Sequence, residues 1–295
     1  MALYSERMSA HLQCFEQRFS AYLPVTGTRQ DTVIEAMRYA CEGGGKRLRP
    51  VLVMEFCRLC GGNVEAALPF AAAIEMIHSY SLVHDDLPCM DNSPLRRGKP
   101  SVHAAYGEDM ALLTGDALLN AAFETMLKTH DGVSPQATVT AAGLLADYAG
   151  IYGMIGGQVI DLQSEDKCID LDTLRDLQEK KTVALIKAAC CMGCAVGGGT
   201  EQQMLAAEQY GEYVGAAFQV VDDILDVTST AEQLGKPVGS DADNHKNTYV
   251  SLLGLPAARE LAAQHTAKAT DALAVFGAQG DDLRSLANAL LERVW

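Results

Sequence analysis

Aromatic residues, basic residues and long apolar runs are all scarce in this chain of 295 residues. Phe, Trp and Tyr make up 6% of it, while Ala-rich and Leu-rich segments with little β-branched alternation favour helices over strands. The net charge of −15 makes nucleic acid and anionic lipid surfaces unfavourable partners. No uncharged apolar run reaches the roughly 18 residues that a membrane span needs, and the first residues contain no apolar signal core. We therefore expect a cytoplasmic protein without a membrane span.

The nine cysteines are an odd number scattered through apolar segments, which is typical of reduced cytosolic thiols. Cys57-x-x-Cys60 and Cys191-x-x-Cys194 have the spacing of zinc or redox motifs. Both lie in helix-like apolar runs without an accompanying histidine or turn framework. We interpret them as buried small apolar residues rather than metal ligands.

The periodicity predicts a single all-α domain over residues 1–295, because no linker or composition break divides the chain. Glycine-rich segments at 153–157 and 197–199 are expected to separate helices, and Asp31 is expected to be an N-cap. Helices are predicted over residues 31–42, from about 50, and over 66–86, 109–128, 136–150, 172–197 and 200–227, then from 255 onward.

Two aspartate clusters, well over a hundred residues apart, are the strongest functional signal. They read Asp85-Asp86-Leu-Pro-Cys-Met-Asp91 and Asp222-Asp223-Ile-Leu-Asp226. Clustered carboxylates repel one another and resist burial unless cations neutralise them. Mg²⁺ prefers carboxylate oxygens and, when held by few of them, keeps positions open for phosphate oxygens. Two such clusters in apolar stretches indicate one cavity that holds a polyphosphate through several metal ions; solvated helix ends are the alternative.

The two clusters are expected to differ in geometry. Asp222 and Asp226 lie one turn apart on one face of a predicted helix. Asp85 and Asp91 are six residues apart, which places them about 120° off a shared helix face. Because Pro88 disfavours helix at the residue before it, we expect the helix to end at the first Asp pair and an irregular turn to bring Asp91 round.

Basic residues follow flexible breaks beside these clusters. Residues 43–50, Gly-Gly-Gly-Lys-Arg-Leu-Arg-Pro, place three cations after a glycine run but lack the spacing of a P-loop. Arg96 and Arg97 can serve two anions, one per side chain. His78, on the helix that leads to the first cluster, is a candidate donor, with a core histidine as the alternative. Weaker signals are Lys181-Thr182, Gly156-Gly157-Gln158 with Asp161, Gly235-Lys236 and Lys246.

Together these motifs, in this order, resemble those of the trans-prenyl diphosphate synthases, and most closely the bacterial-type farnesyl diphosphate synthases. The likeness runs from about residue 26 to nearly the C-terminus. It implies an all-helical bundle of the isoprenoid synthase type with a deep central cavity, assembled as a homodimer. The implied ligands are isopentenyl diphosphate and allylic diphosphates, with three Mg²⁺ ions that Mn²⁺ can replace.

The resemblance also assigns the site residues. The implied metal ligands are Asp85, Asp91, Asp222, Asp226, Asp161 and Asp241, the last three partly through bound water. The implied allylic diphosphate site contains Arg96, Lys181, Lys236 and Asp86, and the implied isopentenyl diphosphate site contains Lys46, Arg49, His78 and Arg97. The implied catalytic set is Lys181, Thr182, Gln219 and Lys236, with Thr182 and Gln219 beside the carbon chain.

Product length depends on the floor of the cavity. Tyr80 lies five residues before Asp85, about 7.5 Å along the helix, and Ser81 beside it is small. In the enzymes that the chain resembles, an aromatic residue here, together with the extra residues around Pro88, marks a fifteen-carbon product. The alternative is that Tyr80 faces the core or a dimer contact.

Three other functions remain open at this point. A geranylgeranyl or geranyl diphosphate synthase would differ only in product. A terpene cyclase also uses aspartates and Mg²⁺, but it would not need a second diphosphate site. A non-catalytic subunit of a heteromeric synthase usually lacks some aspartates, and both clusters are complete here.

Overall fold

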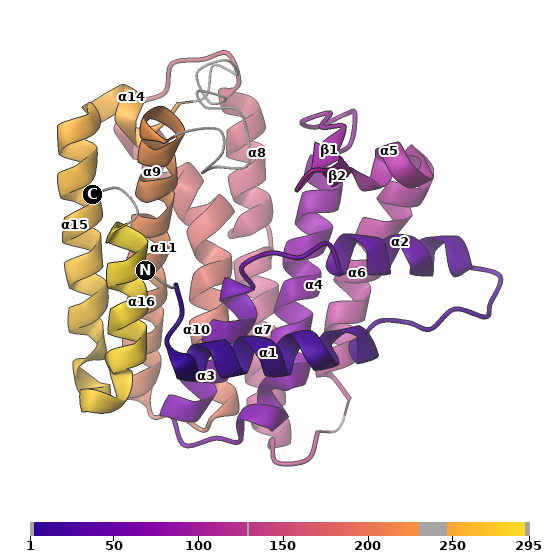
Figure 1. The fold of residues 1–295 in the computed structure, drawn as a ribbon, viewed down its shortest axis with the longest axis horizontal. Coiled ribbons are helices and arrows are strands. Elements are labelled where there is room, and N and C mark those ends of the chain that lie inside the picture. Colours follow the sequence, from indigo (N-terminus) through magenta and orange to yellow (C-terminus); the bar gives the residue numbers. More distant parts are fainter. Residues whose placement is uncertain (1–2, 129, 230–246, 293–295) are drawn as a thin grey trace.

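The computed structural model describes residues 3–128, 130–229 and 247–292, and its regular structure is almost entirely helical (Figure 1). Among these residues the strands form one two-stranded ribbon, in which Leu95 pairs with Pro100 and Arg96 with Lys99. This confirms the predicted all-α fold class. The first half contains α1 (Glu6–Phe19), η1 (Ser20–Tyr22), α2 (Asp31–Cys41), α3 (Leu48–Leu59), η2 (Val64–Ala67), α4 (Leu68–Asp85), β1 (Leu95–Arg96), β2 (Lys99–Pro100), α5 (Val102–Tyr106) and α6 (Glu108–Met126).

The second half of the chain adds further helices to the same bundle (Figure 1). It contains α7 (Pro135–Ala149), α8 (Met154–Ser164), α9 (Leu171–Gln178), η3 (Glu179–Val183), α10 (Ala184–Val196), α11 (Glu201–Thr228), α14 (Tyr249–Leu253), α15 (Leu255–Ala272), η4 (Leu273–Gly280) and α16 (Asp281–Leu291). The helix predicted over residues 172–197 is confirmed as the continuous run from α9 to α10. Its middle, η3, is a π-helical turn, a feature that often marks functional sites.

Helices α4 and α10 form the centre of the core. α4 packs against α6 and α3, and α10 packs against α11, α3 and α7. Both are buried on nearly every side, which explains why their sequences are apolar rather than amphipathic. By length and composition Val64–Asp85 could cross a membrane, but 83% of its most apolar window is buried inside the bundle. That burial is typical of a core helix.

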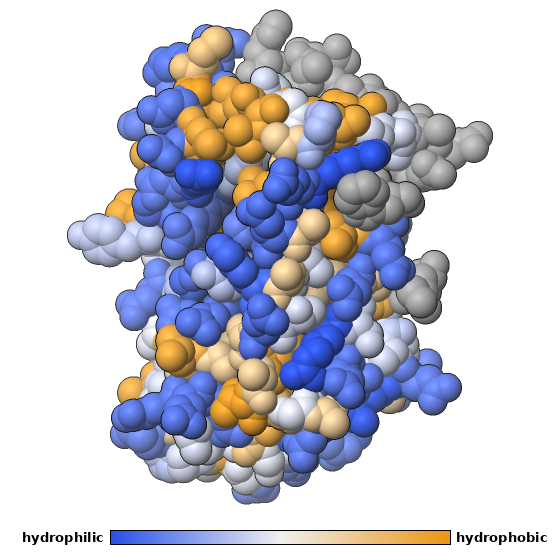
Figure 2. Space-filling model, turned by 90° about the vertical axis from the view of Figure 1, so that its left-hand side faces the viewer, coloured by the Kyte–Doolittle hydropathy of each residue, from blue (hydrophilic) through white to orange (hydrophobic). Residues whose placement is uncertain are grey.

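The side of the molecule formed by α11, α15 and α16 supports the second aspartate cluster (Figure 1). Buried alanines of α15, such as Ala258 and Ala262, pack against buried residues of α11 such as Val221 and Ile224, and small side chains let two helices approach closely. Figure 2 shows this side from outside: hydrophilic side chains cover most of it, with separate apolar patches. The packing fixes the long helix α11 against the rest of the bundle.

Two local predictions were wrong, each for a physical reason. Residues 153–157 do not separate helices, because α8 begins at Met154 and contains Gly157. A Cβ at Gly157 would lie 2.2 Å from the Lys181 backbone nitrogen, so this glycine serves helix packing. Asp31 is the first residue of α2 rather than its N-cap, and its carboxylate accepts a 2.8 Å hydrogen bond from the Thr28 N–H.

The two Cys-x-x-Cys segments lie in the core, as predicted. Cys57, Cys191 and Cys194 are buried, and the Sγ atoms of Cys60 and Cys194 are 3.4 Å apart. Burial raises the pKa of the Cys57 and Cys191 thiols to about 12. These cysteines therefore act as small apolar residues that join α3 to α10.

Candidate active site

The first aspartate cluster begins where α4 ends. Asp86 is the C-cap, and the chain then turns so that the Asp91 N–H donates a 2.8 Å hydrogen bond to the Asp85 carbonyl. Leu87 is buried beneath this turn, and Asn92 closes it with a left-handed φ of 47°. The turn predicted from Pro88 is confirmed, and it brings the Asp85 and Asp91 backbones together.

Asp85 lies at the centre of a charged cluster. Burial, together with the charges of Asp91 and Asp161, raises its pKa to about 6 against the opposing charges of Lys181 and Arg96. Three carboxylates therefore interact at one place, as metal-binding carboxylates do. Within the described ranges no three His, Cys, Asp or Glu groups converge closely enough to hold an ion by themselves.

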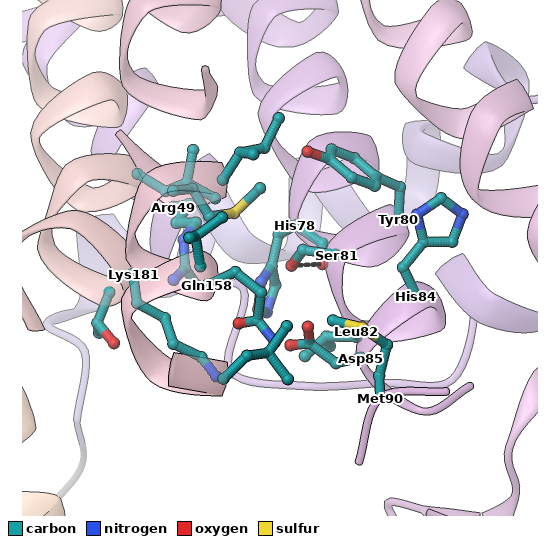
Figure 3. Close-up of a pocket in the computed structure, with 16 residues that line it drawn as sticks. Arg49, His78, Tyr80, Ser81, Leu82, His84, Asp85, Met90, Gln158 and Lys181 are labelled. Carbon is teal, nitrogen blue, oxygen red and sulfur yellow. Dashed lines mark hydrogen bonds between the residues drawn. The ribbon is translucent and has the colours of Figure 1, made fainter. Parts of the chain in front are cut away.

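Lys181 faces this cluster from the opposite wall of the cavity (Figure 3). Its Nζ lies 2.5 Å from Asp161 Oδ2, an ion pair between η3 and α8. Burial opposes the charge of Lys181, but Asp161 and Asp85 outweigh burial and raise its pKa. The π-helical turn and the glycine at position 157 together allow this close approach.

The side chains of Arg96 and Arg97 have different surroundings. Arg96 Nη2 lies 2.6 Å from Asp86 Oδ1, and the Asp86 side chain is only 3% exposed. Asp86 is therefore turned toward Arg96, and its assignment among the direct diphosphate ligands is wrong, since a buried and paired carboxylate repels an anion. Arg97 has a left-handed φ of 52° and turns the other way: a Cβ on Gly45 would lie 2.6 Å from its Nη1.

The residues predicted to bind isopentenyl diphosphate gather around this arginine. Burial and Arg97 lower the pKa of Arg49 against the influence of Glu75, and the Arg49 Nε is buried without a hydrogen-bond partner in the described part of the chain. Burial, then Arg49 and Arg97, hold the pKa of His78 well below its usual range, so its imidazole is neutral. Lys46 is exposed, and its Nζ lies 5.8 Å from the centre of the Phe218 ring. Cations that repel one another in this way favour an anion between them.

The second aspartate cluster lies on α11 and is linked to Lys181 through Thr182. Thr182 Oγ1 donates a 3.2 Å hydrogen bond to Gln219 Oε1, and the Gln219 amide donates to Asp223 at 2.9 Å. Asp223 also accepts from the Tyr249 N–H at 2.8 Å, which explains its burial. Asp222 and Asp226 lie one turn apart on α11, as predicted. Lys236, Asp241 and Lys246 lie outside the described residues.

A cavity of about 380 Å³ lies between some of these groups, and its volume is within the range of small-molecule sites. Arg49, His78, Asp85, Lys181 and Thr182 line its polar end, and Tyr80 and Ser81 line it farther along α4 (Figure 3). The walls that the sequence did not predict come from α8, α10, α4 and the turn after it: Met154, Ile155, Val159, Leu162, Leu185, His84 and Met90. The α8 residues were missed because the glycines before them resemble a helix break.

Tyr80 lines this cavity and also belongs to the hydrophobic core around α4. Its side chain lines the cavity, and its hydroxyl is buried without a hydrogen-bond partner in the described ranges. Its ring meets the His84 ring edge to face, with centroids 5.8 Å apart. A Cβ at Gly115 would lie 1.9 Å from His84 Nε2, so α6 needs glycine there to admit His84.

Comparison with known proteins agrees with this geometry. The family model described as "Polyprenyl synthetase" matches residues 30–277, which is more than half of the chain. The chain belongs to the polyprenyl synthetase family. It is accordingly a prenyltransferase with the single helical domain of the isoprenoid synthases.

Curated and solved relatives differ in the products that their names give. The chain is 48% identical over 250 residues to geranylgeranyl pyrophosphate synthase 9, chloroplastic, of Arabidopsis thaliana, covering 83% of this chain and 69% of that protein. It resembles the apo FPP/GFPP synthase of Zymomonas mobilis with a TM-score of 0.85 and 39% identity over 97% of both chains. The Helicobacter pylori geranyltransferase complexed with magnesium and isoprenyl diphosphate gives 0.84 and 33% identity over 99% of this chain and 98% of that one.

Proposed function

We propose that this prenyltransferase is a (2E,6E)-farnesyl diphosphate synthase, which condenses isopentenyl diphosphate with dimethylallyl and then geranyl diphosphate. The observation that carries the proposal is the position of Tyr80. Its buried ring lies about 7.5 Å along α4 from Asp85 and lines the cavity into which the growing chain must extend. A longer chain would have to displace this ring, so elongation stops at fifteen carbons.

The proposed metal site contains Asp85, Asp91 and Asp161 on one wall, and Asp222 and Asp226 on α11. Asp241 is a further proposed ligand outside the described residues. The concentration of carboxylates around Asp85 and the magnesium with which the Helicobacter pylori relative is complexed support Mg²⁺, three ions per site. Bound Mg²⁺ would supply positive charge to the allylic diphosphate as it leaves.

In the first step the allylic C–O bond breaks, and the electron pair leaves with the diphosphate. Arg96 and Lys181, both held in place by carboxylates, would stabilise the charge that develops on the departing oxygens; Lys236 is proposed to join them. Thr182 and Gln219, which are hydrogen-bonded to each other, would lie beside the ionised carbon. The surrounding apolar wall would exclude water, which would otherwise quench the carbocation.

In the second step the double bond of isopentenyl diphosphate attacks the carbocation, and a proton is then lost. Lys46, Arg49, His78 and Arg97 would hold this second diphosphate. The neutral His78 would donate one hydrogen bond, while its surroundings of cations make it a poor base. The proton would therefore pass to the departing diphosphate.

Homodimer formation and a cytoplasmic location are also proposed. Several large apolar side chains are exposed on α6 and α8: Leu112 (50%), Leu113 (48%), Ile155 (41%) and Val159 (41%). A second copy that covers them would also close the cavity wall that Ile155 and Val159 form. Analytical ultracentrifugation tests this, and a monomer at micromolar concentration would contradict it.

One assay tests the function. Purified protein, Mg²⁺, dimethylallyl diphosphate and isopentenyl diphosphate should give mainly a C15 product by chromatography. A C20 product would instead favour a geranylgeranyl diphosphate synthase, the activity for which the curated relatives are named. No product at all would favour a non-catalytic subunit.

The Tyr80→Ala variant tests the cavity floor directly. Removing the ring opens space beyond it, so we expect products longer than C15, with the first condensation largely unchanged. Ser81→Ala, the next residue on α4, is the matched control, since its hydroxyl donates to the His78 carbonyl and Ala keeps a small side chain. An unchanged product distribution in Tyr80→Ala would contradict the proposed control of length.

A further inference from the structure

Arg47 stands between Lys46 and Arg49 in the chain, yet its side chain is turned into the core. The side chain is only 1% exposed. Its Nε donates to Glu16 Oε1 at 2.7 Å, its Nη1 to Glu75 Oε1 at 2.6 Å and its Nη2 to the Cys41 carbonyl at 2.7 Å. All three guanidinium nitrogens are thus engaged inside the protein, and Arg47 cannot reach a diphosphate in the cavity.

The backbone at Arg47 has an unusual conformation. Its φ of 48° and ψ of 37° are left-handed, which a residue with a side chain rarely adopts unless surrounding contacts hold it there. This turn is the N-cap of α3, and the Arg47 carbonyl accepts from the Val51 N–H at 3.2 Å. The turn directs Arg47 inward, while Lys46 before it is exposed and Arg49 after it lines the cavity.

Other contacts make the same turn a support for the cationic cluster. The Tyr4 hydroxyl donates a 2.6 Å hydrogen bond to the Lys46 carbonyl. The Gly45 backbone lies directly against the Arg97 guanidinium, since a Cβ there would lie 2.6 Å from Nη1. A shift of the turn would therefore move Lys46, Arg49 and Arg97 together.

Glu75 joins this turn to α4. Its side chain is 3% exposed, and it lies three residues before His78 on the same helix. Its charge also acts on Arg49 and Arg97. Without Arg47, the buried Glu75 carboxylate would have no ion-pair partner. It would then attract Arg49 and Arg97, which should face the anion.

We propose that Arg47 is a positioning residue for the isopentenyl diphosphate site: its buried pair with Glu75 and its second pair with Glu16 hold the left-handed turn that sets Lys46, Arg49 and Arg97 around the anion. This inference rests on the proposed function, in which these cations and His78 bind that substrate. It adds a residue that does not itself touch the ligand.

The test compares Arg47→Met with the double variant Arg47→Met/Glu75→Met. A displaced turn misplaces three cations, so we expect the KM for isopentenyl diphosphate to rise about 10- to 100-fold in both, with the KM for geranyl diphosphate within about twofold. The Tm should fall in the single variant and recover in the double one, because the double variant leaves no unpaired buried carboxylate. If the single variant does not fold, the double variant carries the test.

Arg58→Met is the matched control. Arg58 also lies on α3 and pairs with a buried glutamate, Glu55, at 2.7 Å, but it does not line the cavity. We expect it to lower the Tm without changing the ratio of the two KM values. A normal KM for isopentenyl diphosphate in the double variant would overturn the inference, and so would an equal rise in both KM values in the Arg47→Met enzyme.

A binding arm separates this inference from the proposed function. Calorimetric titration with inorganic pyrophosphate in the presence of EDTA probes the cationic cluster without metal or turnover. Wild-type protein that binds pyrophosphate but forms no product would refute the proposed function alone. Equal pyrophosphate affinity in wild-type and double-variant proteins would refute the role of Arg47 whatever the activity.

Discussion

On one side of the cavity each cation is paired with a carboxylate, while on the other side the cations face one another. Arg96 pairs with Asp86 and Lys181 with Asp161. In the described part of the chain Arg49 and Arg97 form no ion pair with a carboxylate, and burial together with the neighbouring arginines lowers the pKa of each. The charge of Glu75 raises the pKa of both arginines, but this carboxylate already forms an ion pair with Arg47.

The difference suggests two ways to bind a diphosphate. The paired side is close to neutral and rich in carboxylates, so an anion would be held there mainly together with metal ions. The unpaired side has surplus positive charge and a donor histidine, so it can hold a bare anion. Four changes should break or sharpen this contrast, from the largest expected effect to the smallest.

Lys181→Met should give the largest loss. Lys181 is proposed to stabilise the departing diphosphate, so its removal should lower kcat about 100- to 1000-fold, with both substrates saturating. Lys180→Met is the control, because Lys180 lies in the same π-helical turn but pairs with Asp176 and does not line the cavity. A rise in the KM for isopentenyl diphosphate, with kcat unchanged, would mean that Lys181 belongs to the isopentenyl diphosphate site and would contradict this prediction.

Arg49→Met should affect the unpaired side only. Loss of a charge-assisted hydrogen bond to an anion costs about 1.5–3 kcal/mol, so the KM for isopentenyl diphosphate should rise about 10- to 100-fold. Initial rates at saturating geranyl diphosphate measure this. An equal rise in the KM for geranyl diphosphate would mean that the two sides are not separate.

The two sides should also respond differently to pH. The pKa of Asp85 in the folded protein is raised to about 6. In the absence of metal, Asp85 therefore adds to the free energy of unfolding only while its carboxyl group is protonated. This contribution is complete below about pH 4, the ordinary carboxyl pKa, and is lost as the pH rises through about 6.

Protons should therefore compete with Mg²⁺ on the paired side. We expect the increase in Tm caused by Mg²⁺ to grow between pH 5 and pH 7, with a midpoint near pH 6. In Asp85→Asn this pH dependence should disappear. Pyrophosphate binding in EDTA should show no step attributable to His78 over this range, since His78 is already neutral. A Mg²⁺ effect that is constant from pH 5 to pH 7 would contradict the assignment of Asp85.

Gly157→Ala should have the smallest effect on turnover and act mainly on stability. Its Cβ would meet the Lys181 backbone at 2.2 Å, and forced overpacking costs about 1–3 kcal/mol. Gly143→Ala on α7 is the control, because no atom lies within 4 Å of a Cβ there; it should stabilise the protein by about 0.5–1 kcal/mol. Chemical denaturation measures both, and equal shifts would refute the packing role of Gly157.

The sequence predicted the turn at Asp91 from Pro88, and the structure confirms it. The roles that residue type and motif order assign to the charged groups stay predictions. Helix α1 was not predicted: it is polar overall and only a few of its residues, such as Met8 and Phe15, are buried. Helix α8 was not predicted either, because glycine can end a helix or let two helices touch, and the sequence does not distinguish these uses.

Glu75 shows most clearly which contacts the sequence could not predict. A carboxylate in the middle of the apolar α4 indicates that a cation must neutralise it. Nothing near Glu75 in the sequence identifies Arg47 as that cation. The partner is 28 residues away and belongs to a segment whose other basic residues serve the cavity. Asp86 poses the same problem, since the sequence placed it together with Arg96 in the allylic diphosphate site but did not show that the two side chains pair with each other.

The sequence by itself determined the helical fold, the family and the groups available for diphosphate chemistry, because these depend on periodicity, residue type and motif order. Only the tertiary structure decided which charges pair with one another and which stay available to a ligand. The physical reason is that pairing depends on distances of a few ångströms between helices far apart in the chain. Lys46, Arg47 and Arg49 are close together in the sequence, yet the left-handed turn at Arg47 sends its side chain into the core, whereas Arg49 lines the cavity.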